Sequence, residues 1–133
     1  MNVKRIKVVK LKVIKNKKGN LSKYLSKKDK YFSFFGETYF TEIKRNMVKG
    51  WNYHEKCTCL ISVIYGKVKF TFADQIDKKK RNITIGKKNF SLIVLPPKVW
   101  FKFTSLEGTS IIVNTINKVH SLMQIRHHLY IFQ

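Results

Sequence analysis

The chain has 133 residues, of which 44% are hydrophobic and 14% are aromatic. This composition excludes a disordered chain, and no apolar run approaches the roughly 20 residues that cross a bilayer. The length predicts one domain over residues 1–133, large enough to bury a core without disulfides or metals.

The 28 Lys and Arg residues outnumber the 7 Asp and Glu residues and give a formal net charge of +21. The excess is mostly lysine scattered along the chain, whereas a dedicated nucleic-acid-binding protein usually concentrates its charge and favours arginine. A phosphate-bearing ligand is well served by this charge, and a basic nucleic-acid-binding protein is the weaker alternative. Within residues 1–18 basic residues interrupt every apolar stretch, so no signal-peptide core is expected and a cytoplasmic location is predicted.

The elements predicted along the chain are short strands separated by turns. An opening strand over residues 7–14 carries lysines that would protect a sheet edge from aggregation. Leu21, Tyr24 and Leu25 have helical spacing, so a short helix is predicted within residues 21–30. Further strands are predicted over residues 37–43, 59–65, 67–72, 83–85, 90–95, 100–103 and 110–115.

One of these strands bears on the charge question. Residues 67–72 alternate basic and apolar side chains, as an RNA-binding strand can. The apolar members, Val68, Phe70 and Phe72, share one face, however, and this pattern is more typical of a core strand.

The C-terminal stretch has a different period. Leu122, Ile125 and Leu129 fall on one face of a helix, which predicts a short C-terminal helix over residues 119–130. Many short strands at even spacing, with Gly and Asn at the turns, predict an all-β sandwich or barrel for the rest.

Cys57 and Cys59 are the only cysteines. Two cysteines so close in sequence would form a strained disulfide, and two thiols alone make a poor zinc site. Both are therefore predicted to be reduced and to fill space as small apolar side chains.

Two segments, Lys49 to His54 and Leu95 to Trp100, each consist of a turn that leads into a strand. Between them lies a strand that begins at Gly66 and ends at Asp74. This layout resembles a small cupin, in particular the dTDP-4-dehydrorhamnose 3,5-epimerases and related sugar-nucleotide isomerases. The resemblance covers residues 15–126 and implies an all-β, single-domain jelly roll, or double-stranded β-helix.

The resemblance also indicates which catalytic positions have changed. The family's catalytic His corresponds to Asn52, and the Tyr of its closing strand corresponds to Asn114. An amide cannot exchange a proton at neutral pH, so an orthodox 3,5-epimerisation is not expected. His54 lies two residues after Asn52 and shares its strand face, which makes it the candidate base. The alternative is a structural histidine that is hydrogen-bonded at the barrel mouth.

Substrate-binding residues follow from the same comparison. Lys18, Lys49 and Lys102 could bind a diphosphate as point charges. Trp51 and Trp100 each follow a turn, where an indole could stack on a sugar or a base, or could instead plug an end of the barrel.

The residues at the positions that bind metal in other cupins indicate a metal-independent protein. These positions fall on Asn52, His54, Cys59 and Phe101, which include only one ordinary ligand. No metal site and no cofactor are therefore expected.

The sequence thus predicts a divergent epimerase-like or isomerase-like cupin. It would act on, or bind, a nucleoside-diphosphate 4-keto-6-deoxy sugar in surface polysaccharide biosynthesis. A homodimer is implied because relatives pair through their N-terminal strands. The alternative is a non-catalytic sugar-nucleotide-binding or accessory cupin.

Overall fold

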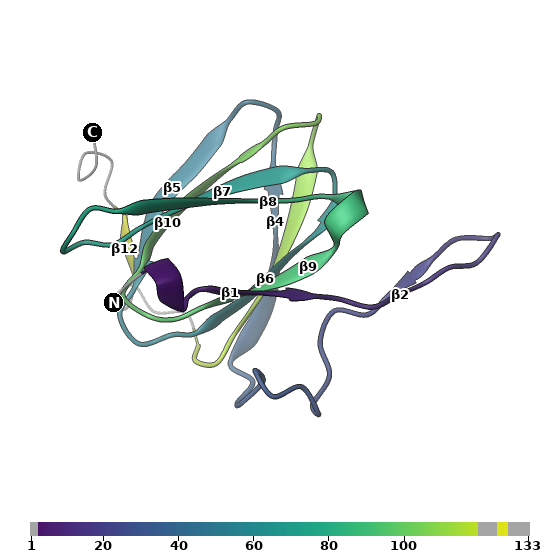
Figure 1. The fold of residues 1–133 in the computed structure, drawn as a ribbon, viewed down its shortest axis with the longest axis horizontal. Helices are drawn as coiled ribbons and strands as arrows, with labels where there is room; N and C mark the ends of the chain where they lie inside the picture. Colours follow the sequence, from purple (N-terminus) through teal and green to yellow (C-terminus); the bar gives the residue numbers. More distant parts are fainter. Residues whose placement is uncertain (1–2, 120–124, 128–133) are drawn as a thin grey trace.

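Two five-stranded antiparallel sheets pack against each other in the computed structural model, which describes residues 3–119 and 125–127 (Figure 1). The first sheet has the order β1 (Lys7–Lys10), β9 (Ser91–Leu95), β6 (Cys59–Tyr65), β11 (Ser110–Ile116) and β4 (Glu37–Ile43). The second has the order β12 (Ile125–His127), β5 (Val48–His54), β10 (Trp100–Ser105), β7 (Val68–Ala73) and β8 (Lys80–Ile85). The predicted all-β jelly roll is confirmed.

The core lies between the two sheets because each strand alternates its side chains. In β7, Val68, Phe70 and Phe72 are fully buried, whereas Lys69 between them is exposed. Ile61 and Ile112 face them from the first sheet and belong to the same buried cluster. The apolar face of residues 67–72 is therefore core, as its period predicted, and is not available to stack on RNA.

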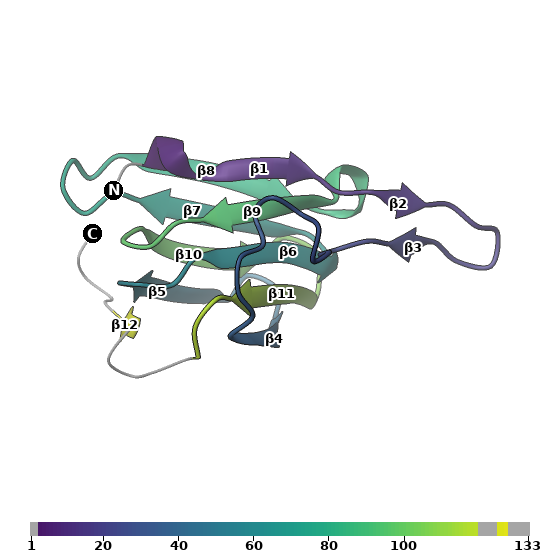
Figure 2. The ribbon, with the colours of Figure 1, turned by 90° about the horizontal axis from the view of Figure 1, so that it is seen from below.

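A small hairpin projects from one end of this sandwich (Figure 1, Figure 2). It consists of β2 (Val13–Ile14) and β3 (Leu21–Ser22), which pair with each other and form their own two-stranded sheet. The remaining regular elements are two 3-10 turns, η1 (Val3–Arg5) and η2 (Lys87–Asn89).

The chain returns from the hairpin across the outer face of the first sheet. There the Tyr24 hydroxyl donates a hydrogen bond to the Leu60 carbonyl and shares a second hydrogen bond, of 2.9 Å, with the Thr115 hydroxyl. The predicted helix within residues 21–30 is wrong, because β3 occupies its first two residues and turns and irregular chain follow. The residues whose spacing had suggested a helix have other roles here, because Leu21 pairs with β2 and Tyr24 anchors the chain to the first sheet.

The predicted C-terminal helix is also wrong over residues 125–127. These residues form β12, which pairs antiparallel with β5 and places Arg126 opposite Tyr53. Main-chain hydrogen bonds to a sheet edge here outweigh the local helical period. The rest of that predicted helix, residues 120–124 and 128–130, lies outside the described residues.

The described part of the chain contains no helix long and apolar enough to cross a membrane.

The buried aromatic face of β7 provides a test of the fold. Phe72→Ala removes a fully buried ring, and we expect it to lower the free energy of unfolding by about 3–5 kcal/mol in urea denaturation. Phe40→Ala is the matched control, since Phe40 is 66% exposed and its loss should cost no more than about 0.5 kcal/mol. Equal costs for the two variants would contradict this core.

Candidate functional site

A cavity of about 370 Å³ opens between the two sheets. One wall comes from β4, β6 and β11, and the other from β5, β7 and β10. The lining residues are Tyr39, Thr41, Lys49, Gly50, Asn52, His54, Ile61, Phe70, Phe101, Phe103, Ile112 and Asn114. Polar groups thus face one another across an interior that is otherwise apolar and aromatic.

An irregularity in β5 decides which of its side chains reach the cavity. The pairing of β10 with β5 shifts register between Phe101 and Lys102, opposite Gly50. Gly50 has φ +116°, and a Cβ there would lie 2.7 Å from the Phe101 carbonyl oxygen, so only glycine fits. Because of this bulge, Lys49 and Asn52 line the same cavity although they are three positions apart.

His54 follows on the same face as Asn52 and lines the cavity. It is 5% exposed, and its ring stacks on Phe101 with 5.9 Å between ring centroids and 14° between planes. The imidazole is therefore positioned by packing, which a catalytic base requires.

The opposite wall carries a pair of residues that face each other across neighbouring strands. Asn114 of β11 lies opposite Tyr39 of β4, and its Nδ2 donates a hydrogen bond of 3.0 Å to the Tyr39 hydroxyl. Burial raises the pKa of Tyr39 well above its ordinary value, so the phenol stays protonated at neutral pH.

Tyr39 and Thr41 are cavity residues that the sequence analysis did not single out. The available signal was their alternation within residues 37–43, which the sequence analysis predicted to be a strand. That alternation identifies residues on a common face, but it does not identify which face is turned inward.

The structure places four of the predicted binding residues away from the cavity. Trp51 and Trp100 are buried in a separate cluster with Tyr53 and Ala73. Tyr53 and Trp100 lie opposite each other in the register of β5 and β10, with ring centroids 4.8 Å apart. Their strand neighbours Asn52 and Phe101 point into the cavity, so this cluster lies on the other face of the sheet. Neither indole therefore lines this cavity, and stacking of the two indoles on a ligand stays a prediction.

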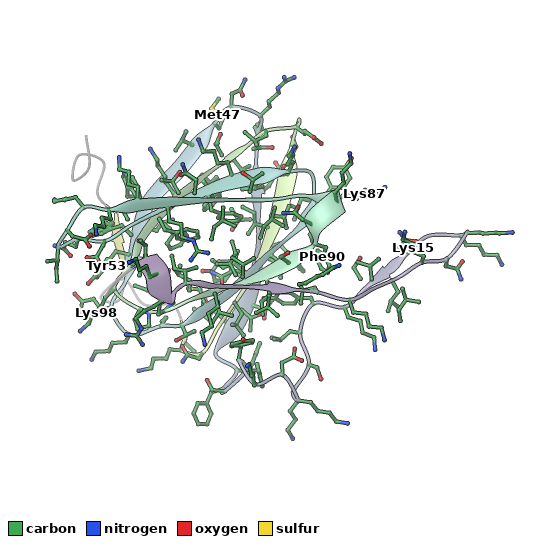
Figure 3. All side chains as sticks on the ribbon, in the orientation of Figure 1. Lys15, Met47, Tyr53, Lys87, Phe90 and Lys98 are labelled. Carbon is green, nitrogen blue, oxygen red and sulfur yellow. The ribbon has the colours of Figure 1, made fainter. Side chains whose placement is uncertain are left out.

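The other two predicted binding residues that lie away from the cavity are lysines. The Lys102 ammonium lies over the Trp51 ring, 4.9 Å from its centroid, and so shares that outer face. Lys18 lies in the turn of the projecting hairpin, where its amide donates to Asn16 Oδ1 at 2.9 Å. Figure 3 shows Lys15 on the same hairpin, distant from Tyr53 at the other end of the molecule. Of the three predicted phosphate-binding lysines, only Lys49 lines the cavity.

Among the described residues, no group of three or more His, Cys, Asp or Glu side chains is arranged to hold a metal ion. Cys59 is fully buried, and burial raises the pKa of its thiol to about 12. A thiol with this pKa remains protonated at neutral pH and is a poor metal ligand.

A family model described as FdtA: WxcM-like, C-terminal matches residues 4–123. The chain belongs to this family. The predicted resemblance to the cupins that isomerise or epimerise sugar nucleotides is therefore confirmed. No curated protein sequence matches the chain.

Several solved structures have a similar fold, and their names describe enzymes that isomerise or epimerise sugar nucleotides. A dTDP sugar isomerase from Desulfovibrio desulfuricans G20 has a TM-score of 0.91 and 25% identity, over 96% of this chain and 85% of that chain. A dTDP-4-dehydrorhamnose 3,5-epimerase from Bacillus anthracis, solved with TDP and pyrophosphate, has a TM-score of 0.84 and 15% identity, over 98% and 82%. A mutant of the 3,4-ketoisomerase QdtA from Thermoanaerobacterium thermosaccharolyticum, in complex with TDP-4-keto-6-deoxyglucose, has a TM-score of 0.80 and 18% identity, over 96% and 90%.

The burial of the two thiols predicts their reactivity. Cys57 is 1% and Cys59 0% exposed, and the raised pKa of Cys59 leaves little reactive thiolate at pH 8. We expect no alkylation by iodoacetamide in the native protein and two additions in urea, as measured by intact mass. Rapid modification of the native protein would contradict this burial.

Proposed function

We propose that the chain is a metal-independent sugar-nucleotide isomerase or epimerase that acts in the cavity between the sheets. The proposed substrate is a nucleoside-diphosphate 4-keto-6-deoxy sugar. The observation that carries the proposal is the position of His54, a buried imidazole that lines a cavity together with Lys49, Asn52 and Asn114. Membership of a sugar-nucleotide isomerase family supports this choice of substrate.

The proposed chemistry begins with proton removal by His54. Its neutral imidazole takes a proton from a carbon beside the ketone, and the electron pair of that C–H bond moves onto the keto oxygen as an enediolate forms. The Lys49 ammonium, which lines the same cavity, stabilises this negative charge. Return of a proton to the opposite face of the same carbon gives an epimer. If the proton instead returns to the former keto carbon, and the proton of the adjacent hydroxyl passes to the former keto oxygen, the ketone moves to the neighbouring carbon.

Asn52 has a different part in this scheme. Its amide can donate and accept hydrogen bonds but cannot transfer a proton at neutral pH. It therefore binds and orients the sugar, and proton transfer falls to His54, the histidine among the residues that line the cavity. A cavity of about 370 Å³ suits the sugar, and the nucleoside diphosphate then extends through the mouth of the barrel.

The same proposed substrate suggests where in the cell the protein works and in which pathway. We infer that it works in the cytoplasm as a single cupin domain and contributes to surface polysaccharide biosynthesis, where nucleoside-diphosphate deoxy sugars are precursors.

We further propose that the protein is a homodimer in which the hairpin β2–β3 packs on a second copy. An isolated two-stranded hairpin is only marginally stable in water. This hairpin projects from the sandwich (Figure 2) and exposes Ile14 and Leu21, at 43% and 55%. Burial of these side chains against a partner would stabilise it.

The catalytic proposal is tested by solvent exchange. In deuterated water we expect the wild-type protein to catalyse the entry of deuterium into TDP-4-keto-6-deoxyglucose. Mass spectrometry of the sugar nucleotide measures this incorporation. His54→Ala should slow incorporation by roughly 10²–10⁴-fold, because it removes the base. Lys102→Ala is the control, since Lys102 lies outside the cavity, and it should exchange at the wild-type rate.

The other outcomes separate the competing functions. No exchange, together with thermal stabilisation by the sugar nucleotide, would favour the non-catalytic binding cupin. Neither exchange nor stabilisation would refute the proposed substrate. Unchanged exchange in His54→Ala would refute the role of His54.

The dimer is tested by light scattering during size-exclusion chromatography. The wild-type protein should show twice the chain mass of 15.8 kDa. Leu21→Asp should shift it toward the monomer, because a charge would enter the apolar contact. Ile76→Asp is the matched control, since Ile76 is 85% exposed and lies in a loop away from the hairpin. A wild-type monomer would contradict the proposal.

A further inference from the structure

A second cavity, of about 680 Å³, lies on the outer face of the first sheet. It shares no lining residue with the cavity that contains His54. Leu92 of β9 lines this outer cavity, whereas the next residue, Ile93, belongs to the core between the sheets. Because neighbouring residues of a strand point to opposite faces, the two cavities lie on opposite sides of the same sheet.

Two stretches of chain form the sides of the outer cavity. One side is the end of β1, where Val9 lies opposite Leu92 in the register of β1 and β9. The other is the chain that returns from the hairpin over residues 23–31, and Figure 2 shows it crossing in front of β9 and β6. The two sides are joined where the Lys23 amide donates a hydrogen bond of 2.9 Å to the Lys12 carbonyl.

Local hydrogen bonds hold the returning chain in shape. The Ser26 amide donates to Asp29 Oδ2 at 2.8 Å, and the Asp29 amide donates to the Ser26 carbonyl at 3.0 Å. A further turn follows, in which the Phe32 amide donates to the Asp29 carbonyl at 3.0 Å. The side chains of this segment are therefore carried by a backbone of defined shape.

The charged residues of the lining are mostly cations from both sides of the cavity. The lysines among them are Lys10, Lys12, Lys23 and Lys30. The one acidic residue of the lining, Asp29, accepts the hydrogen bond that forms the turn at Ser26. Positive charge is therefore in excess within the outer cavity.

The ring of Tyr31 brings two cations together beside the outer cavity. The Lys7 ammonium, from β1, lies 5.6 Å from the ring centroid, and the Lys30 ammonium, from the returning chain, lies 5.1 Å from it. The negative face of an aromatic ring attracts cations, so Tyr31 offsets part of the repulsion between the two ammonium groups.

Clustered cations attract a ligand that carries several negative charges. A cavity of this size holds a small molecule, so those charges must lie on one compact ligand. We propose that the outer cavity binds a linear polyphosphate chain, whether that of a nucleoside triphosphate or that of inorganic polyphosphate. The ammonium groups of the lining lysines donate charge-assisted hydrogen bonds to the phosphate oxygens. This site is separate from the catalytic cavity and does not depend on the proposed function.

The experiment measures the binding of ATP and of inorganic tripolyphosphate by calorimetry, at roughly 0.1 M salt, where distant charges are screened. Lys10→Ala/Lys30→Ala removes one ammonium from each side of the outer cavity. We expect the wild-type protein to bind both probes and this double variant to bind them at least about tenfold more weakly, because it loses charge-assisted hydrogen bonds.

The matched control makes the same change in net charge outside the outer cavity. Lys27→Ala/Lys28→Ala removes two exposed ammonium groups from the same returning chain, but neither residue lines the cavity. Its affinity for both probes should stay within about twofold of the wild type. Lys49→Ala tests the catalytic cavity in the same way and should leave the affinity for ATP unchanged.

The results separate a built site from general attraction to a basic protein. Loss confined to Lys10→Ala/Lys30→Ala supports the site. Tighter binding of ATP than of tripolyphosphate then identifies a nucleotide site, and tripolyphosphate bound at least as tightly identifies an inorganic polyphosphate site. Equal losses in the two double variants would overturn the proposal, as would a wild-type protein that binds neither probe.

A second pair of lysines keeps the test decisive if Lys10→Ala/Lys30→Ala does not fold, as judged by thermal unfolding. Lys12→Ala/Lys23→Ala removes the other two lining ammonium groups and should weaken binding equally. Deuterium exchange into the sugar nucleotide should proceed at the wild-type rate in all of these double variants, so failure of this site leaves the proposed function standing.

Discussion

The cavity depends on one backbone irregularity, the bulge where β5 meets β10 beside Gly50. A regular strand turns residues three positions apart to opposite faces. The register shift at Phe101 and Lys102 instead lets both Lys49 and Asn52 line the cavity. It requires a glycine because a Cβ would collide with the carbonyl of the facing strand. The polar wall that carries His54 thus depends on one residue without a side chain.

The two sheets then divide the polar groups of the cavity between them. The second sheet supplies an imidazole and an ammonium group, from His54 and Lys49, while the first supplies the phenol of Tyr39 and the amide of Asn114. A flat ligand held between two packed sheets meets different chemistry on each face. Reactions that remove a proton and stabilise the resulting enediolate benefit from such a division, since the two tasks need different groups.

The apolar side chains of the cavity strengthen these polar interactions. Phe70, Phe101 and Phe103 line the cavity beside the polar groups. Hydrogen bonds and charges are stronger in such an apolar environment than in water. The same burial raises the pKa of Tyr39 and keeps it a donor. Asn114 contributes to the same wall, because its Nδ2 donates a hydrogen bond to the Tyr39 hydroxyl across the paired strands.

The amino-acid sequence by itself determined strands such as β4 and β6, the core face of β7 and the shared face of Asn52 and His54, because a period of two is a local property of an extended chain. Only the tertiary structure decided which faces point inward. Trp51 lies next to Asn52, yet the pleat and the bulge place it on the outer face of the sheet. Tyr39 and Asn114 are 75 positions apart and meet only because β4 and β11 pair. Pairing with β5 likewise made residues 125–127 a strand despite their helical period, because hydrogen bonds to a sheet edge come from a distant part of the chain that no local pattern contains.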